Sequence, residues 1–188
     1  MIFLSQLFKS PIETGAIAPT SEKLSKLIVE MANLGEKKCV VELGPGTGVF
    51  TKEIMKHIPK NSEFFSLEIN DEFVKETKLN NPEATVYHAS AKEIKKYLNK
   101  HNQDKSDCII SGLPWGAFAE DIQVDLLNEI YDSLESGGEF LTIALLQGLM
   151  FPPGRRFKKA ISSKFKTVER SKIVWSNLPP GLVYYCVK

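Results

Sequence analysis

Glu42-Leu43-Gly44-Pro45-Gly46-Thr47-Gly48 is the stretch that decides the fold of this chain of 188 residues. It begins at the end of an apolar run, residues 39–43, which is typical of a buried strand. Glycines permit tight turns and let the backbone approach a ligand closely, so the loop indicates a ligand site at the end of that strand. The third glycine follows the second by two residues, whereas the dinucleotide fingerprint requires three, which argues against NAD and FAD.

Two carboxylates accompany this loop. Glu42 stands directly before the glycines, where a carboxylate can hold the amino-acid end of a zwitterionic ligand through ordered water or backbone. Glu68 closes the next apolar run, 20 residues after Gly48, where it can accept hydrogen bonds from both hydroxyls of a ribose. The alternative for Glu68 is an acid that ends a strand without binding a ligand.

Strand-like and helix-like segments alternate after residue 35. We expect strands at residues 39–43, 64–68, 84–88, 107–110 and 139–146. We expect helices at residues 50–58, 71–79 and 91–100, and then an acidic helix that Gly137 and Gly138 end. A further helix, capped by Thr20 or Ser21, precedes them. This alternation predicts a mostly parallel sheet with helices on both faces.

The C-terminal part departs from the alternation. Residues 165–175 and 182–187 are strand-like, and the turn-forming residues between them leave no room for a helix, so the two strands are expected to pair antiparallel. The predicted fold is α/β, a Rossmann-like, mostly parallel seven-stranded sheet with a C-terminal antiparallel hairpin. We expect one domain over residues 1–188, with an N-terminal amphipathic helix and lid region at 1–34 and the core at 35–188.

Charge is balanced overall and segregated locally. The formal net charge is +1, which by itself predicts neither a nucleic-acid nor a membrane partner. Residues 118–140 carry seven acids and no base, whereas residues 155–172 carry eight bases and one acid. The basic tract can either meet a lipid or nucleic-acid phosphate or form a solvated helix face.

The cysteines and the apolar runs limit the class of protein further. Cys39, Cys108 and Cys186 lie in separate apolar runs, which predicts buried thiols and neither a disulfide framework nor a metal site. No apolar run approaches the roughly 20 residues that a membrane span needs. The N-terminus lacks the basic region and the cleavage site of a secretory signal, so we expect a cytoplasmic protein.

The loop and its two carboxylates resemble those of class I S-adenosylmethionine-dependent methyltransferases. In that family the first-strand acid, the glycines and the second-strand acid bind the cofactor, S-adenosyl-L-methionine. Ser90 stands where the family more often has an aspartate near the adenine, and Ala91 can offer a backbone donor there. By position, the resemblance implies a cofactor site made of Glu42, Gly44, Gly46, Gly48, Glu68, Ser90, Ala91 and Gly112.

Three further segments are similar to the soluble phospholipid N-methyltransferases of the phosphatidylethanolamine type, which are related to ribosomal RNA adenine dimethyltransferases. These segments are residues 3–19, Ser111-Gly112-Leu113-Pro114-Trp115 and Val174-Trp175-Ser176-Asn177-Leu178-Pro179-Pro180. Methyltransferases of this fold that act on a nucleobase amine place an asparagine at the position of Gly112. Because glycine has no side chain, the amide that would hold an adenine amino group is missing, which argues against a nucleobase acceptor.

The same resemblance implies that Pro114 and Trp115 lie at the methyl acceptor. Pro114 would fix a carbonyl that accepts a hydrogen bond from the amine, and Trp115 would attract a cation to its ring. The alternative for Trp115 is a core aromatic residue. Arg155 or Arg156 could clamp a lipid phosphate.

A general base is needed to deprotonate an ammonium acceptor, and the sequence offers several candidates. The candidate side chains are Tyr184, Tyr185 and His88, and a water molecule is an equally good candidate for the base. We expect no metal-ligand site from the sequence.

The expected partners are a phospholipid substrate and an anionic membrane surface, contacted through the N-terminal helix and the 155–172 tract, with peripheral attachment to the inner membrane face. Residues 1–9 carry Ile2, Phe3, Leu4, Leu7 and Phe8 at helical spacing, so this segment either inserts into the membrane interface or closes over the cofactor as a lid. Nucleic acid is not an expected partner. The sequence assigns no oligomeric state.

Three other functions remain as alternatives. The first is an rRNA adenine N-6 methyltransferase, which is opposed by Gly112, by the near-neutral charge and by the lack of length for the C-terminal helical domain of those enzymes. The second is a soluble small-amine methyltransferase. The third is a non-catalytic module that binds S-adenosylmethionine without transferring its methyl group.

Deletion of residues 1–9 tests the membrane role of the N-terminal segment. The shortened chain should sediment less with anionic liposomes than the full chain, because it has lost the apolar side chains that would enter the interface. Equal sedimentation of the two forms would contradict this role.

Overall fold

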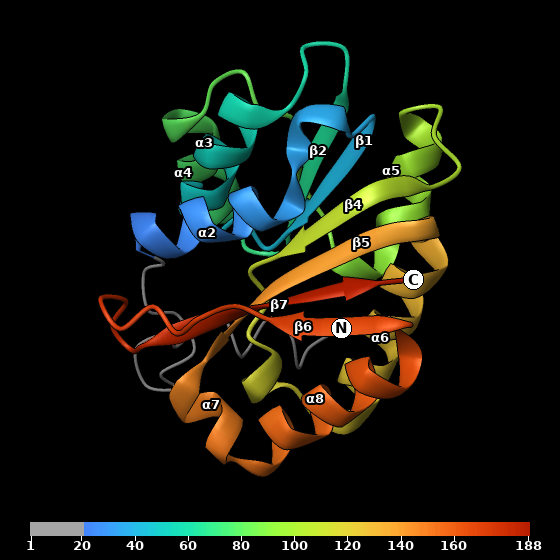
Figure 1. Cartoon of the computed structure of the whole chain (residues 1–188). Helices are drawn as coiled ribbons and strands as arrows, with labels where there is room; N and C mark the ends of the chain where they lie inside the picture. The colour runs from blue at the N-terminus through green and yellow to red at the C-terminus, as the bar shows by residue number, and fades with distance from the viewer. Residues whose placement is uncertain (1–20) are drawn as a thin grey trace.

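The computed structural model describes residues 21–188 and shows a seven-stranded sheet between two layers of helices (Figure 1). The strands are β1 (Cys39–Leu43), β2 (Glu63–Glu68), β3 (Val86–His88), β4 (Ser106–Ser111), β5 (Leu134–Leu145), β6 (Thr167–Arg170) and β7 (Gly181–Val187). The α-helices are α2 (Glu22–Ala32), α3 (Val49–His57), α4 (Asp71–Asn80), α5 (Ile94–Lys100), α6 (Glu120–Ser133), α7 (Leu146–Met150) and α8 (Pro152–Lys164). Short 3₁₀ helices are η1 (Leu34–Glu36), η2 (Ala91–Glu93) and η3 (Trp115–Ala117).

The strand order is β3-β2-β1-β4-β5-β7-β6. Strands β1 to β5 pair parallel, while β7 pairs antiparallel with both β5 and β6. The predicted fold class and the predicted antiparallel pairing of the last two strands are therefore confirmed. Because β5 ends at Leu145 opposite Gly181 of β7, the loop that leads into β7 lies at the same edge of the sheet as the carboxyl ends of the parallel strands.

The core has two layers, one on each face of the sheet. Successive side chains of a strand point to opposite faces, so Val40 contributes to one layer and Val41 to the other. Helices α2, α3 and α4 cover the first layer, and α5, α6 and α8 cover the second (Figure 1). Cys39, Cys108 and Cys186 are buried free thiols, as the sequence predicts.

The acidic helix α6 ends before the glycines that were expected to end it. Leu134 is buried and already pairs with Ser106, so the strand β5 begins there rather than at Glu139. Gly137 and Gly138 lie inside β5, where the register against β4 shifts and Gly137 has φ +78°. The glycines therefore accommodate an irregularity in the strand.

The basic tract contains a helix that the sequence analysis did not assign. Helix α8 starts with two prolines in its first turn, where a proline costs no hydrogen bond. It buries Phe157 and Ile161, which are four residues apart and so lie on one face. The strand expected at 165–175 is shorter than predicted. Two residues lie between Ser171 and Val174, whereas β7 has one residue between their partners Val183 and Gly181, so the ladder is interrupted.

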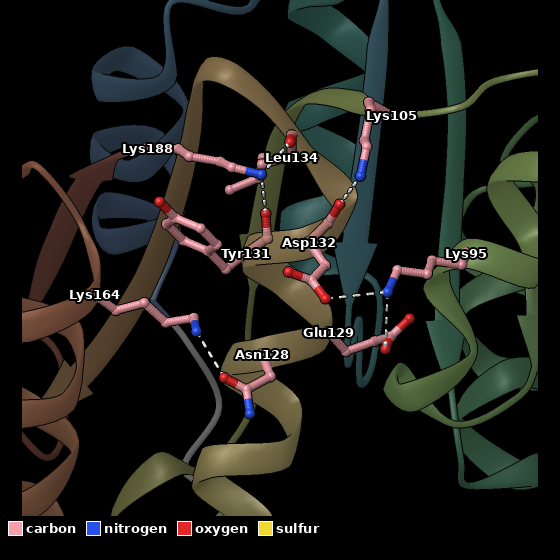
Figure 2. Close-up of polar contacts among 9 residues, drawn as sticks. All are labelled: Lys95, Lys105, Asn128, Glu129, Tyr131, Asp132, Leu134, Lys164 and Lys188. Atoms are coloured by element: carbon pink, nitrogen blue, oxygen red, sulfur yellow. Dashed lines mark hydrogen bonds and ion pairs between the residues drawn. The ribbon is translucent and has the colours of Figure 1, made fainter.

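Polar side chains of α6 contact lysines of the two neighbouring helices, α5 and α8. Lys95 of α5 lies 3.3 Å from Asp132, and Lys164 of α8 donates to Asn128 at 2.6 Å (Figure 2). The Lys188 ammonium donates to the carbonyl oxygens of Tyr131 and Leu134, which end the helix. Cations are stabilising at a helix C-terminus, so the Lys188 contacts favour the end of α6. Burial lowers the pKa of Lys188.

None of the helices within residues 21–188 is both long and apolar enough to cross a membrane.

Candidate functional site

The glycine loop leaves β1 in a conformation that favours glycine at three positions. Gly44, Gly46 and Gly48 have φ values of 69°, 57° and 86°, which side chains disfavour. A Cβ at Gly48 would also fall 2.4 Å from the amide nitrogen of Asn81. A Cβ at Gly46 would meet no atom of residues 21–188 within 4 Å, so within this part of the chain the middle of the loop borders open space.

Glu68 holds this loop from the end of β2. Its Oε2 accepts a hydrogen bond from the Gly46 backbone N–H at 3.2 Å, and its Oε1 accepts one from Asn70 at 2.9 Å. Burial raises the pKa of this carboxyl. The structure thus brings together the second-strand acid and the glycine loop, as expected from the sequence.

Glu42 is fully buried at the end of β1. Its Oε2 accepts hydrogen bonds from the hydroxyls of Thr51 at 2.7 Å and Ser66 at 2.6 Å. Its Oε1 is buried and, among the described residues, has no hydrogen-bond donor. Burial raises the pKa of Glu42 to about 7, while the two hydroxyls act in the opposite direction. An unpaired buried carboxylate oxygen is costly, so this atom is the natural contact for a cationic or hydrogen-bonding ligand.

The two hydroxyls that hold Glu42, those of Thr51 and Ser66, were not predicted from the sequence. Ser66 is the residue of β2 directly opposite Glu42 in the sheet register. A polar residue in the middle of the apolar run Phe64-Phe65-Ser66-Leu67 was the available signal, because a buried hydroxyl needs a partner. Thr51 lies in the first turn of α3 and carried no comparable signal.

A pocket opens between the ends of β2, β3 and β4. Its lining is apolar apart from Glu68 and Ser90. Several lining residues were not expected from the sequence, because they come from the loop after β4 and from α6. The lining residues are Gly44, Leu67, Glu68, Ile69, Ala89, Ser90, Ala91, Leu113, Phe118 and Leu126.

Ser90 and Ala91 lie in this pocket, as expected, and Ser90 also has a structural role. The Ser90 hydroxyl accepts a hydrogen bond from the Lys92 backbone, and Glu93 accepts one from the Ser90 backbone. These contacts form a capping box at the start of η2. The Ser90 side chain is therefore fixed at the pocket wall.

Gly112 follows β4 and lies directly against the glycine loop. A Cβ at this position would fall 2.6 Å from the Gly44 carbonyl oxygen and 3.5 Å from the ring of Phe50. The Gly112 backbone N–H donates to Leu43 at 2.8 Å, which ties the two loops together. An asparagine side chain would require these loops to separate, so the lack of a base-holding amide here follows from their packing.

Trp115 lies in the core and outside the pocket lining. Its side chain is 3% exposed, its ring stacks on Phe157 with centroids 4.5 Å apart, and its indole N–H donates to the Thr142 hydroxyl at 3.0 Å. This position supports the core alternative for Trp115. Pro114 is half-buried beside the pocket residue Leu113, and its carbonyl accepts the Ala117 N–H at 2.9 Å.

The candidate bases are dispersed. Tyr184 is buried against Phe157, and burial raises the pKa of its hydroxyl. Tyr185 donates to Glu139 at 2.9 Å, and burial raises its pKa to about 12. His88 is exposed, with Nε2 2.9 Å from the carbonyl oxygen of Ile69. Of these three side chains, only that of His88 has a hydrogen bond with a residue of the pocket lining in the described part of the chain.

Arg155 and Arg156 lie in the first part of α8, away from the pocket lining. Arg155 is exposed, and the Arg156 Nε is 3.7 Å from the Glu120 carboxylate at the start of α6. Of the predicted cofactor residues, Gly44, Glu68, Ser90 and Ala91 line the pocket, while Glu42, Gly46, Gly48 and Gly112 lie in β1 and in the loops after β1 and β4 and are not among the lining residues. Neither arginine lines the pocket. The expected N-terminal segment, residues 1–9, lies outside the described residues.

Comparison with known proteins places the chain among methyltransferases. The family model described as Ribosomal RNA adenine dimethylase matches residues 19–144. The chain is 27% identical to the ornithine lipid N-methyltransferase of Singulisphaera acidiphila over 188 residues, which cover 98% of this chain and 94% of that protein.

Solved structures of low sequence identity share the fold. TrmN from Thermus thermophilus matches with a TM-score of 0.71 and 16% identity, over 98% of this chain and 53% of that one. The precorrin 8w decarboxylase of Methanobacterium thermoautotrophicum matches with a TM-score of 0.63 and 19% identity, over 92% of this chain and 94% of that one. At these identities the likeness shows the fold alone.

Replacement of Gly112 by alanine tests the contact between the two loops. Gly112→Ala should lower the free energy of unfolding by about 1–3 kcal/mol, because the new methyl group overlaps the Gly44 carbonyl oxygen. Urea unfolding measures this change. Gly35→Ala is the control, since a Cβ there meets no atom of the described residues within 4 Å. Equal stability of Gly112→Ala and the wild type would contradict the tight crossing.

Glu42→Gln tests the buried carboxyl through pH. Below pH 4.5 the group is protonated in both the folded and the unfolded chain. Between pH 4.5 and 7 the unfolded carboxyl ionises while the buried one stays protonated, so the free energy of unfolding should fall with rising pH by on the order of 3 kcal/mol. Glu42→Gln should remove this fall in urea titrations, and the exposed-site control Glu36→Gln should not. An unchanged pH slope in Glu42→Gln would contradict the shifted pKa.

Proposed function

Because the chain belongs to the ribosomal RNA adenine dimethylase family and is an S-adenosylmethionine-dependent methyltransferase, we propose that it methylates the amino head group of a membrane lipid. The observation that carries this proposal is the nearly full-length similarity to an ornithine lipid N-methyltransferase. Phosphatidylethanolamine offers the same chemistry, a primary amine on a lipid, and is the phospholipid acceptor that we favour.

The residues present fit S-adenosylmethionine, which supplies an electrophilic methyl group when it is bound. We assign its adenosine to the apolar pocket and its ribose hydroxyls to Glu68. We assign its ammonium group to Glu42 Oε1, the buried acceptor that lacks a donor among the described residues. Gly44, Gly46 and the other loop residues would let the backbone approach the cofactor closely.

The acceptor amine would approach along the segment after β4. Leu113 lines the pocket, so the neighbouring Pro114 carbonyl is the atom that we assign to orienting the amine. Trp115 and Tyr184 would act as positioning residues, because both pack against Phe157 and so support this segment from the core. Since the leaving thioether needs no acid, alignment of the amine with the methyl group would supply much of the acceleration.

The family description itself favours one alternative, methylation of an RNA adenine. Against it, the Gly112 position has no space for a side chain that could hold an adenine amino group. The net charge of +1 also offers little general attraction to RNA. We therefore rank this function below lipid methylation, together with a soluble small-amine methyltransferase and a non-catalytic binding module.

Peripheral attachment to the inner membrane face is part of this proposal. Arg155, Lys158 and Lys159 are exposed on α8, so the basic tract can present cations to anionic lipid. Arg156 and Lys164 contact α6 instead. Residues 1–9 would add apolar side chains to the same interface.

Parallel methyl-transfer reactions test the acceptor. The protein and radiolabelled S-adenosylmethionine are incubated with vesicles containing phosphatidylethanolamine, vesicles containing an ornithine lipid, ribosomal RNA, or free ethanolamine. Label should enter one or both lipids and should not enter RNA or ethanolamine. Transfer to RNA alone would overturn the proposal, and binding of the cofactor with no transfer to any acceptor would favour the non-catalytic module.

Glu68→Ala tests the cofactor assignment. The variant should lose S-adenosylmethionine binding in calorimetry, because the carboxylate that would meet the ribose and the acceptor of the Gly46 N–H are both removed. A cooperative thermal transition would show that the variant is still folded. Unchanged affinity would exclude Glu68 from the site.

A further inference from the structure

Four large apolar side chains are exposed on two neighbouring segments of the chain. Met150 and Phe151, at the corner between α7 and α8, are 71% and 60% exposed. Trp175 and Leu178, in the loop between β6 and β7, are 69% and 78% exposed. Large apolar groups gathered outside a core mark an interaction surface more often than a single exposed residue does.

The two segments leave the sheet at the same place. Leu145, the last residue of β5, pairs with Gly181, the first residue of β7. The Leu146 N–H at the start of α7 donates to the Pro180 carbonyl at 2.9 Å. Figure 1 shows α7 and the β6–β7 loop projecting from the same side of the molecule. We call Met150, Phe151, Trp175 and Leu178 together the apolar edge.

The apolar edge lies at the end of the sheet that carries the cofactor pocket. The pocket opens at the carboxyl ends of parallel strands, and β5 ends at Leu145 on that side. A Cβ at Gly116, just after the acceptor segment, would lie 3.5 Å from the Cα of Gly148 in α7. A molecule held at the apolar edge would therefore be next to the site of methyl transfer.

Both segments are anchored, so the exposed side chains are held in place. In the β6–β7 loop, Asn177 is 1% exposed, its Oδ1 accepts a hydrogen bond from the Ser21 N–H at 2.8 Å, and its amide donates to the Pro179 carbonyl at 2.6 Å. In α7, Leu146 and Leu149 pack against the core. Buried anchors that hold exposed apolar neighbours indicate a surface formed for binding.

Cations stand beside the apolar edge. Helix α8 follows Phe151 directly and contains five bases and no acid. Of these, Arg155, Lys158 and Lys159 are exposed, and none has an ion pair among the residues that the structure describes. Apolar and aromatic side chains flanked by Arg and Lys match the boundary between lipid head groups and acyl chains.

We propose that Met150, Phe151, Trp175 and Leu178 insert into the interface of an anionic bilayer, with the exposed cations of α8 on the head groups beside them. This inference rests on the proposed function, and it names the surface through which an amino lipid reaches the site without leaving the membrane. The orientation places the open end of the pocket toward the bilayer.

Vesicle sedimentation tests the apolar edge. The full chain, the double variant Trp175→Ser/Leu178→Ser and the double variant Met150→Ser/Phe151→Ser are mixed with vesicles of phosphatidylglycerol and phosphatidylethanolamine. The vesicle partition coefficient of each double variant should be lower than that of the wild type by a factor of roughly ten or more, because apolar side chains that would leave water have been removed. Leu79→Ser is the matched control, since Leu79 is 80% exposed on α4, at the β2–β3 end of the sheet.

Methyl transfer to a short-chain amino lipid below its critical micelle concentration separates docking from chemistry. Both double variants should match the wild type on this monomeric acceptor. Wild-type partitioning of both variants would overturn the inference, and so would a parallel loss of turnover on the monomeric acceptor. A self-association without vesicles that the variants abolish would also overturn it, in favour of a second copy of the chain. Weaker partitioning of the variants, combined with no transfer to any lipid by the wild type, would reject the proposed function and keep the docking surface.

Discussion

The contact between two loops, the one after β1 and the one after β4, determines the geometry of the site. The Gly112 backbone packs against the Gly44 carbonyl so closely that a Cβ would be 2.6 Å from it. This crossing leaves the glycine loop in position for Glu68 to accept the Gly46 N–H, and it sets Leu113 in the pocket wall. The pocket and the missing base-holding side chain therefore have one physical cause.

In the function that we propose, the same crossing would separate cofactor binding from acceptor choice. Glu42 of β1 and Glu68 of β2, the carboxylates that we assign to the cofactor, are buried in the sheet. At the proposed acceptor end, backbone occupies the place of a base-recognising amide, and the nearby Trp115 lies in the core, stacked on Phe157. An amine on a flexible head group does not require a side-chain amide to hold it, whereas a planar base would.

The sequence predicted the sheet well, because strands of this fold are short apolar runs and the glycine loop marks the first turn. It predicted which residues gather around the loop for the same reason. It did not predict α8, whose buried Phe157 and Ile161 are separated by bases that obscure the apolar face. It could not distinguish a core Trp115 from one at the acceptor, because the partner Phe157 lies 42 positions away in the chain and meets it only in the folded protein. The end of α6 was misplaced because pairing of Leu134 with Ser106 outweighs the local preference of the glycines.

The most direct test of lipid methylation offers the protein lipid and RNA acceptors in the same reaction. Purified protein and labelled S-adenosylmethionine are added to a bacterial lysate that contains membranes and ribosomal RNA, and the label is partitioned between an organic and an aqueous phase. Methylation of an amino lipid predicts label in the organic phase that resists ribonuclease and comigrates with a methylated amino lipid. Label that remains in the aqueous phase and is released by ribonuclease would contradict it.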